Sequence, residues 1–218
     1  MSRRLRYSVA VSLDGFIAGP KGEYDWIVTD PAIDLAAMYK EFDTAVMGRK
    51  TYEVVTAQGG HGAMPGLDVV VFSRTLAPAT HPGVRIVNDD PSEVVARLKA
   101  EPGRDIWLFG GGNLFHSLLN AGLVDTVEVA VIPVLLGTGI PLLPPGAATK
   151  LTLADHRTLP ASGIVALAYS IPGGVGRPPR IRHIKTAKAA PNRAKAAARS
   201  RTRTAKKGAR SMKKRKAR

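Results

Sequence analysis

The chain has 218 residues, of which 44% are hydrophobic, enough for one domain with a buried core. It carries 32 Lys and Arg against 17 Asp and Glu, a formal net charge of +15, and no cysteine. The lack of cysteine excludes disulfides, cysteine metal ligands, thiol catalysis and iron–sulfur clusters, and no apolar run approaches the ~18 residues of a membrane span.

Short β-rich apolar runs alternate with helical segments, a pattern typical of an α/β domain with a largely parallel sheet. The predicted strands cover Leu5–Leu13, Thr44–Met47, Val69–Phe72, Asp105–Phe109 and Thr126–Ile132. The predicted helices between them cover Asp34–Glu41, Thr51–Val55, Pro91–Ala100 and Asn113–Ala121. Two later segments, Leu151–Thr158 and Gly163–Ile171, predict a C-terminal antiparallel hairpin.

The most informative motif is a run of glycines between a strand and a helix. It consists of Gly110, Gly111 and Gly112, followed by Asn113. Glycines at such a junction let the phosphates of a ligand approach the backbone, and the helix N-terminus offers free N–H groups and a partial positive charge. A tight turn without any ligand explains the same glycines, so both interpretations stay open.

Two more strand ends carry residues that suit a phosphate. A glycine, two cations and a threonine suited to N-capping begin one helix: Gly48, Arg49, Lys50 and Thr51. Cations are unfavourable at a helix N-terminus unless an anion joins them, although a solvated basic pair remains the alternative. The strand ending at Phe72 is followed by Ser73 and Arg74. Together the three junctions predict a phosphate-bearing ligand at the carboxyl edge of the sheet.

In this order, and with Ser12-Leu13-Asp14-Gly15 after the first strand, the motifs resemble the dihydrofolate reductase superfamily from about Leu5 to Ile171. The resemblance implies a three-layer α/β/α fold with a central mixed, mostly parallel sheet, which binds NADPH and passes its hydride to a flat nitrogen heterocycle. It places Gly48–Thr51 on phosphates, Ser73 and Arg74 near the adenosine 2′-phosphate, and Gly110–Asn113 under the pyrophosphate. The cations favour NADPH over NADH, because the extra phosphate needs positive partners.

Two branches of the superfamily compete. The chain is similar to the C-terminal reductase domain of RibD-type riboflavin enzymes and to stand-alone relatives in Ser12–Gly15, Gly22–Ile27 and Pro133–Leu142. That domain reduces the ribosyl group of 5-amino-6-(5-phosphoribosylamino)uracil. The riboflavin enzymes usually carry a glutamate where this chain has Gly110.

True dihydrofolate reductase is the alternative branch, and it needs a buried carboxylate to help protonate its substrate. Asp34 falls near the expected place, although it lies about two residues too close to Gly48, and it could equally cap a helix. Asp14 is either part of an Asp-Gly turn or a catalytic and substrate-binding carboxylate. Trp26 either stacks on the substrate or packs in a loop. No histidine spacing indicates a metal site.

The last 46 residues, 173–218, hold 18 basic residues and no acidic one, whereas residues 1–172 have a net charge of −3. Such a composition predicts a disordered tail after a reductase domain at residues 1–172. The tail would bind DNA or RNA without sequence preference, so the competing hypothesis is a nucleic-acid-associated protein with an inactive reductase fold. We expect a cytoplasmic protein, nucleoid-associated if the tail binds DNA, and a homodimer paired through Val127–Leu136.

Overall fold

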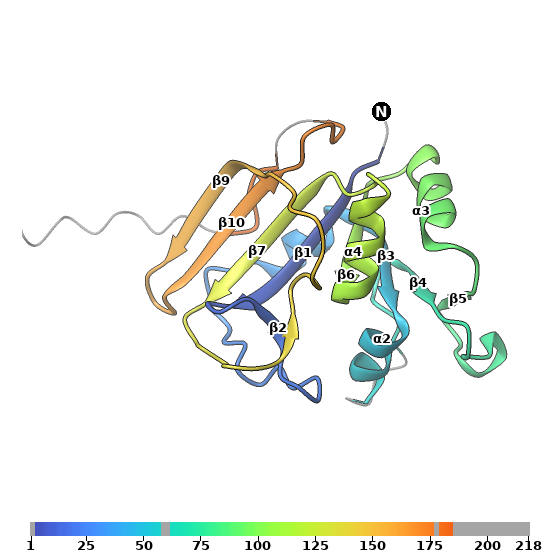
Figure 1. Cartoon of the computed structure of the whole chain (residues 1–218), viewed down its shortest axis with the longest axis horizontal. Helices are drawn as coiled ribbons and strands as arrows, with labels where there is room; N and C mark the ends of the chain where they lie inside the picture. Colours follow the sequence, from blue (N-terminus) through green and yellow to red (C-terminus); the bar gives the residue numbers. More distant parts are fainter. Residues whose placement is uncertain (1–2, 58–61, 177–178, 185–218) are drawn as a thin grey trace, which may run out of the picture. The chain divides into compact units, whose positions relative to one another are not determined.

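The computed structural model describes residues 3–57, 62–176 and 179–184 (Figure 1). In this part of the chain one sheet has the strand order β5-β4-β3-β6-β1-β7-β10-β9, and β2 pairs with β8 outside it. The strands of the sheet are β1 (Leu5–Ser12), β3 (Phe42–Gly48), β4 (Asp68–Phe72), β5 (Arg85–Val87), β6 (Asp105–Gly110), β7 (Thr126–Ile132), β9 (Thr152–Leu159) and β10 (Ile164–Ser170). The separate pair is β2 (Phe16–Ala18) with β8 (Ile140–Pro141).

The sheet is parallel from β5 to β7, and β10 and β9 complete it in antiparallel pairing. The predicted mixed, mostly parallel sheet with a C-terminal hairpin is therefore confirmed. Because β1, β3, β4 and β6 run in the same direction, their carboxyl ends lie at one edge.

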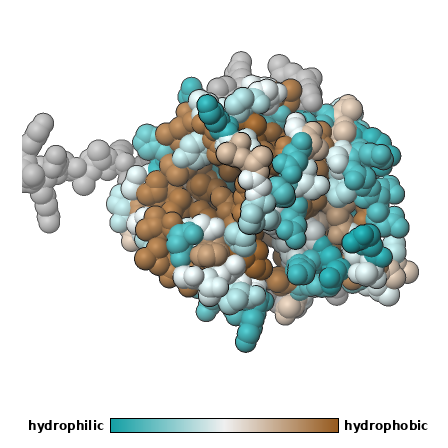
Figure 2. Space-filling view, in the orientation of Figure 1, coloured by the Kyte–Doolittle hydropathy of each residue, from teal (hydrophilic) through white to brown (hydrophobic). Residues whose placement is uncertain are grey.

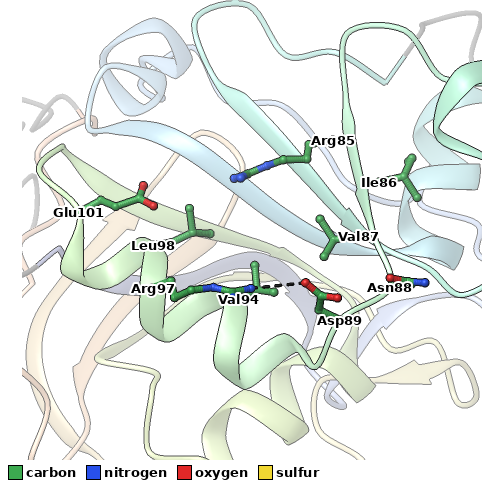
Figure 3. Close-up of a pocket in the computed structure, with 9 residues that line it drawn as sticks. All are labelled: Arg85, Ile86, Val87, Asn88, Asp89, Val94, Arg97, Leu98 and Glu101. Carbon is green, nitrogen blue, oxygen red and sulfur yellow. Dashed lines mark hydrogen bonds and ion pairs between the residues drawn. The ribbon is translucent and has the colours of Figure 1, made fainter.

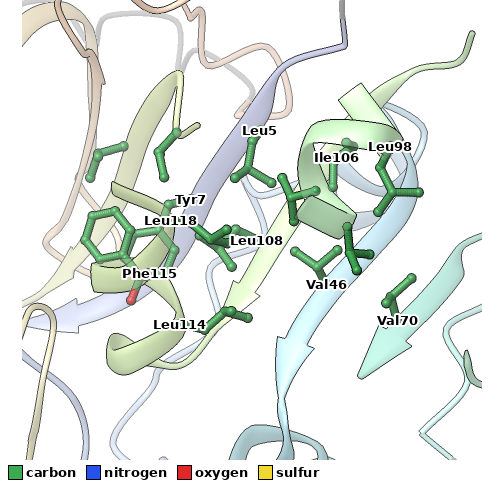
Figure 4. Packing of buried hydrophobic residues seen from close by; sticks show 14 of the residues in the cluster. Leu5, Tyr7, Val46, Val70, Leu98, Ile106, Leu108, Leu114, Phe115 and Leu118 are labelled. Atoms are coloured by element: carbon green, nitrogen blue, oxygen red, sulfur yellow. The ribbon is translucent and has the colours of Figure 1, made fainter. Parts of the chain in front are cut away.

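Helices cover both faces of the sheet. They are α1 (Leu35–Tyr39), α2 (Arg49–Thr56), α3 (Pro91–Ala100) and α4 (Gly112–Asn120), with a short 3-10 turn at Pro78–Thr80. On one face Leu118 of α4 and Val95 of α3 pack with Leu5, Val46 and Leu108 of the strands (Figure 4). Each such fully buried aliphatic side chain stabilises the fold by about 1.5–3 kcal/mol relative to exposure.

The opposite face carries two smaller hydrophobic clusters. Tyr52 of α2 packs with Phe42, Met47 and Trp107 in the first cluster. The second lies over the hairpin strands β9 and β10 and includes Leu159, Ile164 and Ala168. Side chains of alternate residues in β3 divide between the faces, as the period of two in a strand requires.

Local signals placed several elements well. α3 begins and ends as predicted, because Asp90 accepts hydrogen bonds from the amides of Ser92 and Glu93 and Pro91 occupies the first helical position. The helix predicted at Thr51–Val55 begins two residues earlier, with Gly48 as its N-cap, so the capping role expected of Thr51 is wrong. Three short strands, β2, β5 and β8, were not predicted.

The compact unit extends beyond the predicted boundary at Pro172, to Lys185. Ile181 and Ile184 are buried in the cluster over the hairpin, and the amide of Ile181 donates a hydrogen bond to Asp155 at 3.0 Å. The backbone carbonyl of His183 accepts from the amide of Asp34 at 2.7 Å. The boundary at Pro172 is therefore too early, because two isolated isoleucines among basic residues gave no compositional signal. Residues 185–218, the rest of the predicted tail, lie outside the described part.

Charged side chains are buried near the amino edge of the sheet. Arg6 of β1 makes a bidentate pair with Glu128 of β7, with N–O distances of 2.8 and 2.7 Å, and both side chains are almost fully buried. Its guanidinium also contacts Glu41 at 2.6 Å and Asp105 at 3.3 Å. The arginine at position 6 thus belongs to the folded sheet, near the amino ends of its parallel strands.

Candidate functional site

Strands β3 and β6 form a topological switch point at the carboxyl edge of the sheet. The two strands are parallel neighbours, with Met47 in register with Gly110. After β3 the chain passes through α2 to β4 on one side, whereas after β6 it passes through α4 to β7 on the other side. α2 and α4 pack on opposite faces of the sheet. In open α/β sheets ligands bind outside the strand ends at such a point.

The junction of β3 and α2 has the features of an anion site. Gly48 is the N-cap of α2 and supplies no side-chain cap, and the first turn holds no acidic residue. A Cβ atom on Gly48 would meet nothing within 4 Å, so the space above this backbone is open. The free N–H groups of the first turn therefore face a place that an anion can reach.

The junction of β6 and α4 repeats this arrangement beside the first. Gly111 is the N-cap of α4, again without a side-chain cap or a first-turn acid, and the peptide between Gly110 and Gly111 is cis. A Cβ atom on Gly111 would lie 3.1 Å from Thr51 Oγ1. Gly110 has φ +153°, and Asn113 is exposed in the first turn. The structure thus brings two uncapped helix N-termini together.

The strand β4 ends next to the same junction, since Phe72 is in register with Gly48. Arg74 follows two residues after Phe72 and Lys50 two residues after Gly48, and both side chains belong to exposed residues. Within residues 3–57, 62–176 and 179–184, neither cation forms an ion pair. Arg49 differs, because its guanidinium contacts Glu53 at 2.5 Å. Lys50 and Arg74 are therefore the cations best placed for an anionic ligand.

Ser73 is buried, and its side chain forms hydrogen bonds within its own turn. Its hydroxyl accepts hydrogen bonds from the amides of Thr75 at 3.2 Å and Leu76 at 3.0 Å. The role that the structure gives this side chain is to fix the backbone around Arg74.

Asp14 lies at the carboxyl end of β1 and joins two loops. It accepts from the hydroxyl of Ser12 at 2.6 Å and from the amides of Leu136 at 3.1 Å and Gly137 at 2.7 Å. The hydrogen bond from Ser12, helped by the two amides, holds the pKa of Asp14 below its usual range. The carboxylate is thus ionised near neutral pH and can accept, but not donate, a proton or hydrogen bond. The two amides that it binds gave no sequence signal.

The structure gives Asp34 and Trp26 local partners. The carboxylate of Asp34 caps α1 by accepting from the amide of Ala37 at 2.9 Å. Trp26 packs against the cluster over the hairpin and donates its indole N–H to the carbonyl of Glu23 at 3.1 Å. The capping and packing interpretations of these residues therefore have direct structural support.

Small side chains of β1 and β7 form a strip on the α2 face of the sheet, beside the cluster over the hairpin. Ser8 and Ala10 of β1 and Ala130 of β7 are half-buried although they lie in central strands of the sheet. Phe109 of β6 borders the strip on the side of the α2 cluster. Ala10 and Ala130 pack against the cluster over the hairpin, and β1 lies beside β6 in the sheet.

A surface hollow lies elsewhere, between β5 and α3. It has a volume of about 390 Å³ and is formed by β5 and α3, where Arg97 pairs with Asp89 at 3.4 Å (Figure 3). No residue predicted for the cofactor or substrate lines it. In the described part of the chain, no group of three His, Asp or Glu residues is arranged to hold a metal, and no helix there is long and apolar enough to cross a membrane.

Comparison with known proteins identifies relatives of this chain. The model of the RibD C-terminal domain family matches residues 3–165. The uncharacterized protein YyaP of Bacillus subtilis is 34% identical over 179 residues, which cover 77% of this chain and 94% of that protein. The riboflavin biosynthesis protein RibD of Corynebacterium ammoniagenes is 30% identical, but the match covers only 51% of its length.

Solved structures show the same fold. A putative riboflavin biosynthesis protein from Shewanella sp. PV-4 superposes with a TM-score of 0.65 at 24% identity, covering 78% of this chain and 99% of that one. A deaminase and 5-amino-6-(5-phosphoribosylamino)uracil reductase from Thermotoga maritima superposes with a TM-score of 0.58 at 15% identity, over 78% of this chain and 57% of that one. The expected dihydrofolate reductase-like fold is confirmed.

Proposed function

Because the chain belongs to the RibD C-terminal domain family, the reductase part of riboflavin enzymes, we propose that it is an NADPH-dependent reductase of a small heterocyclic substrate. The observation that carries the proposal is the pair of uncapped helix N-termini at adjacent parallel strand ends, with Lys50 and Arg74 beside them. Two helix N-termini at one switch point suit the two phosphates of a dinucleotide.

The residues present fit this cofactor. The open space above Gly48 lets a phosphate reach the first N–H groups of α2, and the hydroxyl of Thr51 lies beside Gly111 to donate to the same anion. The amides that follow Gly111, including that of Asn113, would take the second phosphate. Arg74 and Lys50 would pair with the adenosine 2′-phosphate, which distinguishes NADPH from NADH.

NADPH supplies a hydride when it is bound, and the protein supplies orientation. We place the substrate over the strip of Ser8, Ala10 and Ala130, which adjoins the strand ends that would hold the cofactor. Small side chains there would let a flat ring lie against the strands. Asp14, at the end of the same strand β1, is an acceptor for the polar groups of the substrate.

The substrate that the family relationship favours is 5-amino-6-(5-phosphoribosylamino)uracil or a related pyrimidine, named for the reductase of Thermotoga maritima. Dihydrofolate is the alternative, but its chemistry requires a free carboxylate near α1. The capping bond of Asp34 to the amide of Ala37 opposes that role. Gly110 stands where the riboflavin enzymes usually have a glutamate, which favours a substrate that differs in the groups nearest that position.

A turnover assay tests the proposal. We expect the whole chain to oxidise NADPH in the presence of the pyrimidine and to be inactive with dihydrofolate. The loss of absorbance of the reduced nicotinamide measures the reaction. Asp14→Asn should lower turnover while NADPH affinity is kept, because this residue lies in the turn after β1 and not at the helix N-termini. Oxidation of NADPH with dihydrofolate, but not with the pyrimidine, would instead favour the dihydrofolate reductase branch.

We also propose that the basic C-terminal segment binds nucleic acid without sequence preference. All 17 acidic residues precede Pro172 and 18 of the 32 basic ones follow it, a division that suits phosphate neutralisation. A chain that ends at Lys185, where the compact unit ends, should keep NADPH binding and lose its salt-dependent retention on DNA. DNA binding by a whole chain that binds no NADPH would favour the nucleic-acid-associated protein with an inactive reductase fold.

A homodimer is the third proposal for this chain. Brown side chains gather over β7, β10 and β9 on the left of the molecule in Figure 2, where no helix covers the sheet. Leu167 of β10 and Val131 of β7 are only partly buried, and Leu153 of β9 and Leu135, which follows β7, are exposed. Such an apolar surface suits a two-fold contact between copies. Light scattering should give twice the chain mass, and Leu167→Glu should give a monomer.

A further inference from the structure

His81, in the loop between β4 and β5, contacts Tyr52 of helix α2. Tyr52, the fourth residue of α2, is 2% exposed, and its hydroxyl lies 3.0 Å from His81 Nδ1. The two rings meet edge to face, with centroids 5.3 Å apart and planes at 79°. A hydrogen bond and a ring contact therefore fix the far part of this loop to the helix.

The same loop carries Arg74 near its beginning. There the hydroxyl of Ser73 accepts from the amides of Thr75 and Leu76, and Leu76 packs against the cluster that contains Tyr52. The loop is thus secured at the strand by Ser73 and at the helix by His81. Arg74 lies within this anchored segment, with its side chain free to meet a ligand.

Helix α2 carries Lys50 two residues before Tyr52. The bond between Tyr52 and His81 therefore connects the element that bears Lys50 to the loop that bears Arg74. Two cations held on connected elements bind an anion with less loss of conformational entropy than two on independent segments.

We propose that Tyr52 and His81 are positioning residues, which hold the Arg74 loop against α2 and thereby set the preference for a cofactor with a 2′-phosphate. The inference rests on the proposed NADPH site. Neither side chain touches the cofactor in this account. Loosening the tie leaves the helix N-termini intact, so the pyrophosphate interactions common to NADPH and NADH persist.

The test compares dissociation constants for NADPH and NADH in the whole chain and its variants. Tyr52→Phe removes only the hydroxyl, and His81→Ala removes its partner. Each should weaken NADPH binding about three- to tenfold, part of what full loss of a hydrogen bond to a charged group produces, with NADH binding unchanged. His81→Asn keeps a hydrogen-bonding atom close to the position of Nδ1 and should restore the NADPH preference.

Thr80→Ala is the matched control, because the hydroxyl of Thr80 donates to the carbonyl of Ala77 within its own turn and has no other partner among the residues that the structure describes. If the wild-type chain prefers NADPH and both Tyr52→Phe and His81→Ala keep that preference, this inference is overturned but the proposed phosphate site is not. Equal losses of NADPH and NADH affinity would also overturn it, because they would show a general disturbance of α2. A wild-type chain without preference would overturn the proposed phosphate site and this inference with it.

Discussion

The hydroxyl of Thr51 lies against the backbone of Gly111, so that a Cβ atom on Gly111 would be 3.1 Å from Thr51 Oγ1. Thr51 lies in the first turn of α2 and Gly111 is the N-cap of α4, and these helices pack on opposite faces of the sheet. This proximity joins the two anion-binding helix ends into one site. It exists because β3 and β6 are neighbours in the sheet although about 60 residues separate them in the chain.

Thr51→Val tests the role of that hydroxyl. Valine keeps the shape of the side chain and removes the donor, so we expect NADPH affinity to fall about tenfold, as for a hydrogen bond to a charged group. Thr51→Ser should retain the affinity because it keeps the hydroxyl. The dissociation constants come from fluorescence titration, and equal binding by the valine and serine variants would remove Thr51 from the phosphate site.

Gly48→Ala separates ligand access from stability. The new Cβ meets no protein atom within 4 Å, and Gly48 has φ −82°, which alanine adopts easily. Alanine is a poorer N-cap than glycine, which lowers stability, but it makes the unfolded chain less flexible, which raises stability. The free energy of unfolding should therefore change by less than about 0.5 kcal/mol. NADPH affinity should nevertheless fall, because the methyl group occupies the approach to the first turn of α2.

Gly112→Ala should behave in the opposite way. Its Cβ would lie 2.8 Å from the backbone carbonyl oxygen of Pro141, which cannot rotate aside. We expect a loss of about 1–3 kcal/mol in the free energy of unfolding, the usual cost of overpacking. Urea denaturation of the two glycine variants side by side measures the contrast. A stable Gly112→Ala variant would contradict the close packing of β8 on α4.

Glu128→Gln should strongly destabilise the domain. The substitution removes the charge that faces the buried guanidinium of Arg6 at 2.7 Å. Breaking a buried ion pair costs about 3–5 kcal/mol, and we expect the lower end because Arg6 keeps Glu41 as a partner. Arg97→Ala is the control, since the pair of Arg97 with Asp89 is largely exposed and its loss should leave urea midpoints unchanged.

Glu41 should contribute to the pH dependence of stability. Burial alone would raise its pKa, but the nearby His183, whose Nδ1 lies 3.7 Å from Glu41 Oε1, and the charge and hydrogen bond of Arg6 outweigh burial and lower the pKa. A carboxylate with a lowered folded pKa stabilises above its unfolded pKa of about 4.3, and this stabilisation is lost as the pH falls through the folded value.

Glu41→Gln should therefore reduce stability near pH 7, by about 1 kcal/mol, and flatten the loss of stability below pH ~4.3. Urea unfolding at pH 7 and at pH 3.5 measures both effects. The same pH dependence in the variant as in the wild type would exclude Glu41 as a source of acid sensitivity.

Short-range signals predicted the parts of the fold that depend on local chemistry. Asp90 and Pro91 marked the start of α3, and the alternation of apolar residues marked β7 at its observed bounds. Strands of two or three residues, such as β5 and β8, were missed because their pairing depends on distant partners and not on their own composition.

The site was predictable to a similar degree. The sequence predicted that the glycines and cations at the strand ends lie at one edge of the sheet, and the structure brings these strand ends together, because parallel strands have their carboxyl ends at one edge. Contacts between loops were beyond the sequence, as Asp14 with the amides of Leu136 and Gly137 shows. The burial of Ile181 and Ile184 was missed for the same reason.

The most direct test of the account is a titration of the whole chain with NADPH and with NADH, at a salt concentration high enough to screen the basic C-terminal segment. The account predicts saturable binding of NADPH with a clear preference over NADH, and loss of that preference in Arg74→Ala. Absence of binding, or equal binding of both nucleotides that Arg74→Ala leaves unchanged, would contradict the proposed cofactor site.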